Sequence, residues 1–492
     1  MHRARLQPKS FAQICLAAGL VSSAALAFAG CSASAPTTNP RVTPGAGGSD
    51  NNAAGGGAAM SSGGSSGSGV DLNVGGTSGS LPSGEAFGCP TTLSGTIYDP
   101  SGKLPLYNVV AYVPSEALAP ISNGASCQTC DGNFSGHPIA VALSDAAGHF
   151  QLKLDNVPSG DTIPVVIQVG KWRRQISVPG VKACADTQAA DGSVRLPRDR
   201  SEGDLPRIAV VRGGSDALEC LFRKIGISDS EFSTDAGDGR IQLYASDDGT
   251  AEAGTTQLAS GGSIPLAGTL YSSLDKLMSY DALFLACEGG GKGTFSKYGA
   301  TEFSNMAAYA DAGGRIFGSH YQNYWIRPDK FSLPPYPTVA TFASSQHGFD
   351  VDVTGDVDVS FPKGMAFRDW LVNVGASSAP GKLLIHDGEH TVDSVVAGTA
   401  QQWITVNDPS GHQGVVQYYS FNTPVGKPEC GRMVFSDLHV ASGTGDSGKV
   451  AFPSGCTSTE LSPQQKALAF MLFDLSSCVQ SDDAPVIVPP VK

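Results

Sequence analysis

The stretch Tyr280-Asp281-Ala282-Leu283-Phe284-Leu285-Ala286-Cys287-Glu288-Gly289-Gly290 decides the fold of the larger part of this 492-residue chain. Its apolar run is short and bounded by polar and glycine residues, which is typical of a strand buried on both faces. We expect similar strands at 207–211 and 315–318, with helices at 217–225, 273–278 and 301–312. This alternation predicts an α/β domain over 201–479 with a mostly parallel sheet covered on both faces.

Three segments of this region resemble a known family: YDALFLACEGG, MAAYADAGGRIFGSHYQN and CGRMVFSDLH. They are similar to class I glutamine amidotransferase-like proteins, in particular the trehalose-utilisation-like branch, and imply a flavodoxin-like sheet with an insert at about 335–425. The resemblance places Gly318-Ser319-His320 at the turn where amidotransferases carry a nucleophilic cysteine, and His439 on a late strand. Because Ser319 and His320 stand at that turn, glutamine hydrolysis is not expected.

Polar residues gather at the predicted strand ends, the edge where open α/β sheets bind ligands. Three interpretations stay open. Ser319 can be a nucleophile with a histidine base and an orienting carboxylate. His320, His439 and a carboxylate can instead bind zinc or another divalent ion. The preferred interpretation is a sheet end closed by hydrogen bonds without catalysis, so no metal or cofactor is predicted. The candidate catalytic residues are Ser319, His320, His439, Glu288 and Asp437.

Residues 87–200 contain several short β-prone segments with turn signals such as Asp99-Pro100-Ser101-Gly102 and Asp145-Ala146-Ala147-Gly148. They predict a small all-β sandwich, so the fold class is multidomain: a sandwich followed by an α/β domain. The segments SGTIYDPSGKLPLYNVVAYV and SDAAGHFQLKLDNVPSG resemble carboxypeptidase regulatory-like, or transthyretin-like, domains. That resemblance implies an accessory module without catalysis. Trp172, flanked by cationic residues, is a ligand-binding candidate there, although a core tryptophan is the preferred interpretation.

The N-terminus has basic residues, an apolar run and the ending Leu26-Ala27-Phe28-Ala29-Gly30-Cys31. This pattern predicts a signal peptide over 1–30. The cysteine after Ala-Gly resembles a bacterial lipobox, which implies that Cys31 is lipidated. Residues 31–86 are rich in Gly and Ser and predict a disordered tether, and 480–492 form a C-terminal tail. We therefore expect an exported protein that is lipid-anchored in the cell envelope, at the outer membrane or cell surface or in the periplasm.

Nine of the 11 cysteines follow Cys31. In an exported chain we expect most of them to form disulfides. Spacing favours Cys89 with Cys184, Cys127 with Cys130 and Cys220 with Cys287, although connectivity cannot be deduced from spacing. One pair among the last three leaves a thiol over. The last three are Cys430, Cys456 and Cys478.

The formal net charge is −13 and no basic stripe is present, which argues against a nucleic-acid partner. Tyr321 and Trp325 follow the predicted turn and join Trp172 as aromatic ligand-binding candidates. The leading hypothesis is a non-enzymatic binding or structural module, with carbohydrate or cell-wall glycan as ligand and the membrane or envelope proteins as partners. The alternative is a hydrolase at the sheet end, serine-based or metal-dependent, so whether the chain is an enzyme stays open. The whole arrangement resembles a group of myxobacterial lipoproteins.

Overall fold

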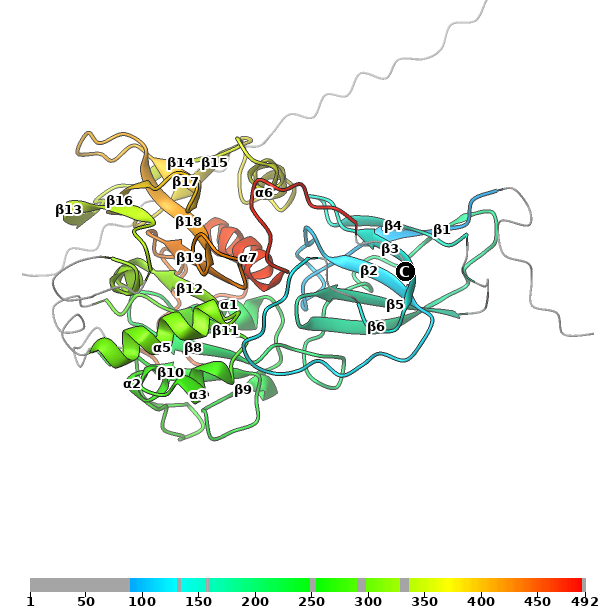
Figure 1. Ribbon diagram of the computed structural model, residues 1–492, viewed down its shortest axis with the longest axis horizontal. Coiled ribbons are helices and arrows are strands. Elements are labelled where there is room, and N and C mark those ends of the chain that lie inside the picture. Colours follow the sequence, from blue (N-terminus) through cyan, green and yellow to red (C-terminus); the bar gives the residue numbers. More distant parts are fainter. Residues whose placement is uncertain are drawn as a thin grey trace, which may run out of the picture. The chain divides into compact units, whose positions relative to one another are not determined.

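A ten-stranded mixed sheet organises the larger part of the computed structural model (Figure 1). The structure describes residues 89–130, 134–155, 157, 160, 162–247, 254–289, 298–327 and 336–488. The strand order is β15-β14-β17-β18-β19-β12-β11-β8-β10-β9. All described residues fall in one compact unit of the chain.

Six neighbouring strands of this sheet run parallel to one another, which confirms the α/β prediction for this part. Ala282 at the start of β11 lies opposite Ile208 of β8 and Arg315 of β12. The parallel strands are β8 (Ile208–Arg212), β9 (Phe232–Ser233), β10 (Ile241–Ala245), β11 (Ala282–Leu285), β12 (Arg315–Ser319) and β19 (Gly431–Ser436).

The remaining four strands pair antiparallel, so the description of the sheet as mostly parallel is wrong for its second half. They come from the predicted insert, which extends the sheet at the open edge of β19. An edge strand offers unpaired backbone groups that such hairpin-connected strands can satisfy. The four strands are β14 (Val353–Val357), β15 (Lys382–Ile385), β17 (Gln401–Val406) and β18 (Val415–Thr423).

Both faces of the parallel half are buried, and successive residues of β8 alternate between two apolar clusters. Ile208 and Val210 pack on the side of α1, α6 and α7, whereas Ala209 and Val211 pack on the side of α2, α3 and α5. This period of two is the geometry of a strand. The helices are α1 (Leu218–Lys224), α2 (Gly268–Tyr271), α3 (Leu274–Met278), α5 (Ala300–Asp311), α6 (Pro362–Asn373) and α7 (Pro463–Ser476).

Helices α7 and α5 show local signals that fix their ends. Ser462 caps α7 and exchanges bonds with Gln465 in a capping box. Helix α5 ends at Gly313, whose φ of 112° lies in the left-handed region, and Gly314 N–H donates to Tyr309 C=O at 3.0 Å. This is a glycine termination, in which a left-handed residue after the helix lets the next N–H bond to one of its last carbonyl groups. Among the described residues, 3₁₀ segments occur at Asp229–Glu231 and His320–Trp325.

Residues 89–188 form only strands among the described residues, in a four-stranded sheet (β3-β2-β5-β6) and a three-stranded sheet (β4-β1-β7). Leu93 of β1 and Val165 of β5 share one apolar cluster with Phe470 of α7, so this region and the α/β region bury apolar side chains together. The strands are β1 (Thr92–Thr96), β2 (Val110–Pro114), β3 (Pro138–Leu143), β4 (His149–Lys153), β5 (Thr162–Val169), β6 (Trp172–Pro179) and β7 (Asp186–Gln188). A separate two-stranded sheet pairs β13 (Ala340–Gly348) with β16 (Glu389–Val395).

The disulfides correct the expected connectivity. Cys89 pairs with Cys184 as predicted. The pairs Cys127–Cys130 and Cys220–Cys287 are wrong, because sequence proximity does not bring the sulfur atoms together in this fold. The observed bonds are Cys127–Cys430, Cys130–Cys478 and Cys220–Cys456. Cys287 is buried and free, the only such cysteine among the described residues.

The predicted signal peptide, the lipidation site Cys31 and the tether lie outside the described residues. Within the described part of the chain, no helix has the length and apolar character needed to cross a membrane. The membrane attachment therefore stays a prediction from the N-terminal sequence.

Candidate functional site

Three neighbouring parallel strands end side by side, and each is followed within three residues by a metal-ligating or nucleophilic side chain. Cys287 follows β11, His320 follows β12 and His439 follows β19. Because β11, β12 and β19 are adjacent and parallel, their carboxyl ends meet at one edge of the sheet. The topology thereby gathers three residues that are distant in sequence.

The three side chains converge to hydrogen-bonding distance. His320 Nδ1 lies 3.1 Å from His439 Nε2 and 3.5 Å from Cys287 Sγ, and Cys287 also bonds to the His439 side chain. Cys287 is 0% exposed, and the two histidines are 4% and 8% exposed. These residues form a compact polar group, the Cys-His-His cluster, beneath the surface.

Two carboxylates orient the histidines of the cluster. His439 Nδ1 donates to Asp387 Oδ2 at 3.0 Å, which leaves the Nε2 lone pair facing the cluster in the neutral ring. Glu389 Oε2 lies 3.6 Å from His320 Nε2, too far for a hydrogen bond but close enough for its charge to favour a hydrogen there, and in that tautomer His320 Nδ1 also presents a lone pair. Two lone pairs 3.1 Å apart repel one another unless a proton or a metal cation lies between them.

The backbone at the site lies in a rarely occupied region. His320 has a φ of 38° and Asp387 a φ of 55°, although neither residue is glycine. Such positions cost about 1–3 kcal/mol each and concentrate at functional sites. Asn323 Nδ2 donates to the His320 carbonyl at 2.8 Å and Tyr321 stacks on the His320 ring, so local contacts hold the unusual conformation.

The two histidines of the cluster have pKa values that are shifted in opposite directions. Burial, followed by the positive charge of His439, lowers the pKa of His320 to about 3, so this ring stays neutral. Burial opposes the charge on His439, but bonds to Asp387 and Cys287 outweigh it and raise its pKa well above the usual value. Burial also raises the pKa of Glu389 to about 7. The cluster thus attracts one positive charge, which a proton or a metal ion can supply.

The spacing suits a tetrahedral metal ion. Zinc bonds of about 2.3 Å to sulfur and 2.0–2.1 Å to nitrogen separate tetrahedral ligands by roughly 3.5 Å for S and N and roughly 3.3 Å for two N atoms. The observed separations are 3.5 Å and 3.1 Å. Histidines that donate their other nitrogen to a carboxylate are typical zinc ligands. The donors Cys287, His320 and His439 therefore fit zinc, in contrast to the sequence-based expectation of no metal.

The other predicted catalytic residues lie elsewhere. Ser319 Oγ donates to Asp216 Oδ2 and is not paired with a histidine, so the serine triad is not assembled. Asp437 accepts the Thr391 N–H at 2.7 Å, and burial raises its pKa to about 6. Glu288 is buried beside Tyr271 and Tyr324, whose pKa values are raised by burial and then by its charge. These three residues support the sheet end and do not join the cluster.

Two of the three aromatic ligand-binding candidates lie in the core, which for Trp172 is the preferred interpretation of the sequence. Trp172 is 0% exposed, packs edge-on against Phe473 of α7 and donates to Ser476 Oγ at 3.3 Å. Trp325 is 1% exposed and packs against Tyr271 and Phe303. Both are core side chains, since each fills the space between packed elements. Tyr321 alone stays partly accessible, beside His320.

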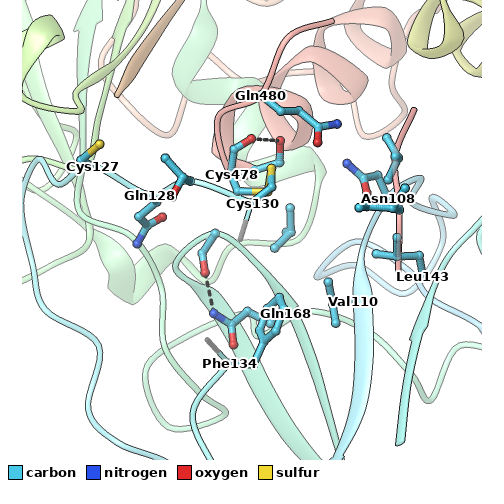
Figure 2. A pocket seen from close by; sticks show the side chains of 16 residues that line it. Asn108, Val110, Cys127, Gln128, Cys130, Phe134, Leu143, Gln168, Cys478 and Gln480 are labelled. Carbon is cyan, nitrogen blue, oxygen red and sulfur yellow. Dashed lines mark hydrogen bonds between the residues drawn. A yellow bond between two sulfur atoms is a disulfide. The ribbon is translucent and has the colours of Figure 1, made fainter. Parts of the chain in front are cut away.

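A second candidate site is a cavity of about 290 Å³ beside the disulfide Cys130–Cys478. Figure 2 shows four amide side chains around it, from Asn108, Gln128, Gln168 and Gln480, together with Phe134. None of the described residues that line it is charged. An uncharged lining of amides and apolar groups suits a neutral polar ligand.

Sequence reasoning missed Cys287, Asp387 and Glu389 as site residues. The position of Cys287 directly after a strand was a usable signal, because His320 and His439 follow strands in the same way. A second signal was the odd number of cysteines after Cys31, because pairing nine cysteines leaves at least one free thiol. Asp387 precedes β16 and Glu389 begins it, both in the predicted insert, and no sequence pattern connects them to the histidines.

Comparisons with known proteins add the following. Neither a protein-family model nor a curated protein matches the sequence. A ThuA-like protein from Bacteroides uniformis covers 54% of this chain and 90% of its own, at 12% identity and a TM-score of 0.29. A cytoplasmic protein from Salmonella typhimurium covers 55% of this chain and 98% of its own, at 12% identity and a TM-score of 0.30.

The N-terminal domain of mmIFT52 covers 55% of this chain and 97% of its own, at 11% identity and a TM-score of 0.31. Similarities at this level carry no argument about chemistry. The function proposed below therefore rests on the residues of this chain.

Proposed function

We propose that this protein is a metal-dependent hydrolase whose ion is held by Cys287, His320 and His439. The observation that carries the proposal is the approach of His320 Nδ1 to His439 Nε2 at 3.1 Å and to Cys287 Sγ at 3.5 Å. A thiolate with two imidazoles suits zinc, and three protein ligands leave a fourth position for water or substrate. The metal-dependent alternative is thereby preferred over the serine-based one.

The strand order supports this location for an active site. The parallel strands run β10-β8-β11-β12-β19, which is the order of a flavodoxin-like sheet, and its switch point lies between β8 and β11. Cys287 follows β11 at that point. In the same proposal residues 87–200 form a carboxypeptidase regulatory-like sandwich that serves as an accessory module.

The chain's own residues have distinct roles in the proposed reaction. A bound zinc ion supplies a Lewis acid and lowers the pKa of its water. Asp387 orients His439 through the Nδ1 hydrogen bond. Glu389 is buried beside His320 and can hold a proton next to the reacting group. Tyr321, stacked on His320, lines the same side and can contact substrate.

The test uses the full-length chain and its Cys287→Ser, His439→Ala and Ser319→Ala variants. We expect cobalt to give a thiolate-to-metal charge-transfer band in the wild type and in Ser319→Ala, but not in Cys287→Ser. We expect hydrolysis of a panel of chromogenic esters, phosphoesters and peptides to disappear with a chelator, to return with zinc, and to be lost in His439→Ala. Ser319 borders the cluster without joining it, so its variant is the matched control.

A cysteine nucleophile predicts a different result. Cys287, His439 and Asp387 also form a thiol, base and orienting carboxylate. In that case iodoacetamide abolishes turnover, chelators have no effect, and no thiolate–cobalt band appears. This outcome would overturn the metal proposal. If neither the cobalt band nor any turnover is observed, the hydrolase proposal is wrong and the binding-module hypothesis is favoured.

We also propose that the chain is exported and anchored through a lipid on Cys31. The basic N-terminal residues, the apolar run and the Ala-Gly-Cys31 ending support this location. Growth with a fatty-acid analogue should label the wild type, and Cys31→Ala should lose the label. Equal labelling of both proteins would refute lipidation.

A glycan-binding function remains a second proposal, now placed at the amide-lined cavity of Figure 2. Sugar hydroxyls both donate and accept hydrogen bonds, as the amides of Gln128 and Gln480 do, and Phe134 offers an apolar face. Calorimetry with neutral cell-wall oligosaccharides should detect binding that Gln128→Ala and Phe134→Ala weaken. Gln175→Ala, on the exposed side of β6, is the control. Equal affinity of all four proteins would exclude the cavity.

A further inference from the structure

A second group of histidines lies in the two-stranded sheet of β13 and β16. His347 of β13 is the direct cross-strand partner of His390 of β16. Directly opposed residues of an antiparallel pair point to the same face, and here the two ring centroids are 5.2 Å apart. The strand pairing therefore places two imidazoles together on one face of this sheet.

Asp408 joins these histidines from the turn that follows β17. Its Oδ1 accepts the Ser410 N–H at 2.7 Å, so the turn holds the carboxylate in place. Its Oδ2 lies 2.7 Å from His390 Nδ1, 3.0 Å from His347 Nε2 and 3.5 Å from His412 Nδ1. Three imidazole nitrogens thus surround one buried carboxylate oxygen, and we name these four residues the Asp408 cluster.

The hydrogen-bond pattern of His390 favours a cation at this position. Its Nε2 lies 2.8 Å from Asp393 Oδ1, so the ring donates its hydrogen to Asp393. Its Nδ1 lies 2.7 Å from Asp408 Oδ2, another acceptor, so this contact needs a cation there, either a hydrogen on Nδ1 or a metal ion. A metal ion bound by both atoms turns this contact between two acceptors into a pair of bonds.

The cluster is buried on one side and open on the other. The side chains of Asp408 and His390 are 1% and 2% exposed, whereas those of His347 and His412 are 38% and 63% exposed. A site with some ligands in the interior and others at the surface is open to a metal ion from solvent. The backbone also separates this cluster from the Cys-His-His cluster, because neighbouring strand residues point to opposite faces: His390 faces Asp408, whereas Glu389 faces His320.

We propose that His347, His390 and Asp408, whose ligand atoms lie within 4.8 Å of one another, form a second transition-metal site beside His412, independent of the Cys-His-His cluster. Imidazole nitrogens with one carboxylate oxygen suit zinc, and also nickel or copper. Asp393 is a positioning residue, since it orients His390 through the other ring nitrogen. An ion at this site ties β13, β16 and the turn after β17 to one another. None of its ligands is a sulfur atom, so cobalt bound at this site gives no thiolate-to-metal band. That band therefore reports only on the Cys-His-His cluster.

The test measures metal binding by the full-length chain with zinc and with cobalt. The double variant His347→Ala/His412→Ala replaces the accessible ligand His347 and the histidine beside the site, and it should bind one equivalent less zinc than the wild type, with its thiolate–cobalt band unchanged. Asp393→Asn should weaken zinc binding at this site by about 10–100-fold. His386→Ala is the matched control, because His386 pairs with Asp352 at 2.8 Å outside both clusters.

The outcomes separate the two metal proposals. If the first proposal fails, the wild type still binds one equivalent without a thiolate band, and the double variant loses it. The second site is overturned if the double variant, with a wild-type circular dichroism spectrum, keeps the wild-type stoichiometry and affinity. It is also overturned if Cys287→Ser binds no metal, because the Asp408 cluster is intact in that variant.

Discussion

At the scale of single residues, the backbone around Cys287 leaves almost no space. A Cβ on Gly213, which follows β8, would lie 1.9 Å from the Cys287 carbonyl oxygen. The close approach of these two strand ends sets where the thiol points. Packing therefore requires glycine at position 213. The φ angle of Gly213 does not lie in the left-handed region, so backbone conformation is not the reason.

We predict that Gly213→Ala lowers the free energy of unfolding by about 1–3 kcal/mol, the usual cost of overpacking. The added methyl group displaces the peptide of Cys287, so the affinity for zinc should fall with it. Urea unfolding and metal titration measure the two effects. Gly160→Ala is the control, since among the described residues its Cβ meets one atom, the Thr162 carbonyl oxygen at 3.9 Å. A fully stable Gly213→Ala with wild-type metal affinity would contradict this account.

At the scale of elements, the turn after β1 contains a buried carboxylate. Asp99 Oδ1 accepts hydrogen bonds from Ser101 Oγ at 2.6 Å and from the Lys103 and Leu104 N–H groups at 3.2 Å. Its side chain is nevertheless 0% exposed, and burial raises its pKa from 3.8 to about 6. The turn thus includes a group whose charge opposes folding.

We predict a pH-dependent difference between Asp99→Asn and the wild type. Because the folded pKa is raised, the favourable contribution of Asp99 is present below pH 3.8 and is lost as the pH rises through about 6. Relative to the wild type, Asp99→Asn should gain about 2 kcal/mol between pH 4 and pH 7. Urea unfolding at several pH values measures it. Asp145→Asn, in an exposed turn, should show no such gain; an equal gain in both variants would argue against burial as the cause.

At the scale of the whole molecule, two disulfides connect the segment 127–130 to the C-terminal part of the chain. Cys127–Cys430 spans 303 residues and Cys130–Cys478 spans 348. With the first bond intact, the second closes a loop made only of residues 127–130 and 430–478. The constraint that each bond adds is therefore smaller than its sequence separation suggests.

We predict that Cys130→Ser/Cys478→Ser lowers the free energy of unfolding by about 4 kcal/mol, from a loop of roughly 50 residues in the chain-entropy estimate. Removing both bonds should cost more than the sum of the two separate losses, because each shortens the loop that the other closes. Denaturant unfolding of the three variants tests this. Strict additivity would show that the two bonds act independently.

Local patterns were enough to predict several of the strands and helices, although strands such as β10, β14 and β15 were not expected. The apolar run at 280–286, the termination of α5 at Gly313-Gly314 and the capped helix α7 depend on neighbouring residues only. The positions of His320 and His439 at strand ends could be predicted for the same reason. Parallel strands bring their carboxyl ends to one edge whichever order they take.

Tertiary structure alone decided which distant residues meet. Cys287 pairs with two histidines and not with Cys220, because the sheet order places β11 beside β12, and β12 beside β19. Asp387, Glu389 and the Asp408 cluster depend on the register between β13 and β16 and on the path of the predicted insert. Trp172 is core because α7 covers β6, a contact between residues 304 positions apart. Strand register and long-range packing depend on how much apolar surface the whole chain buries. A local sequence pattern does not contain that information.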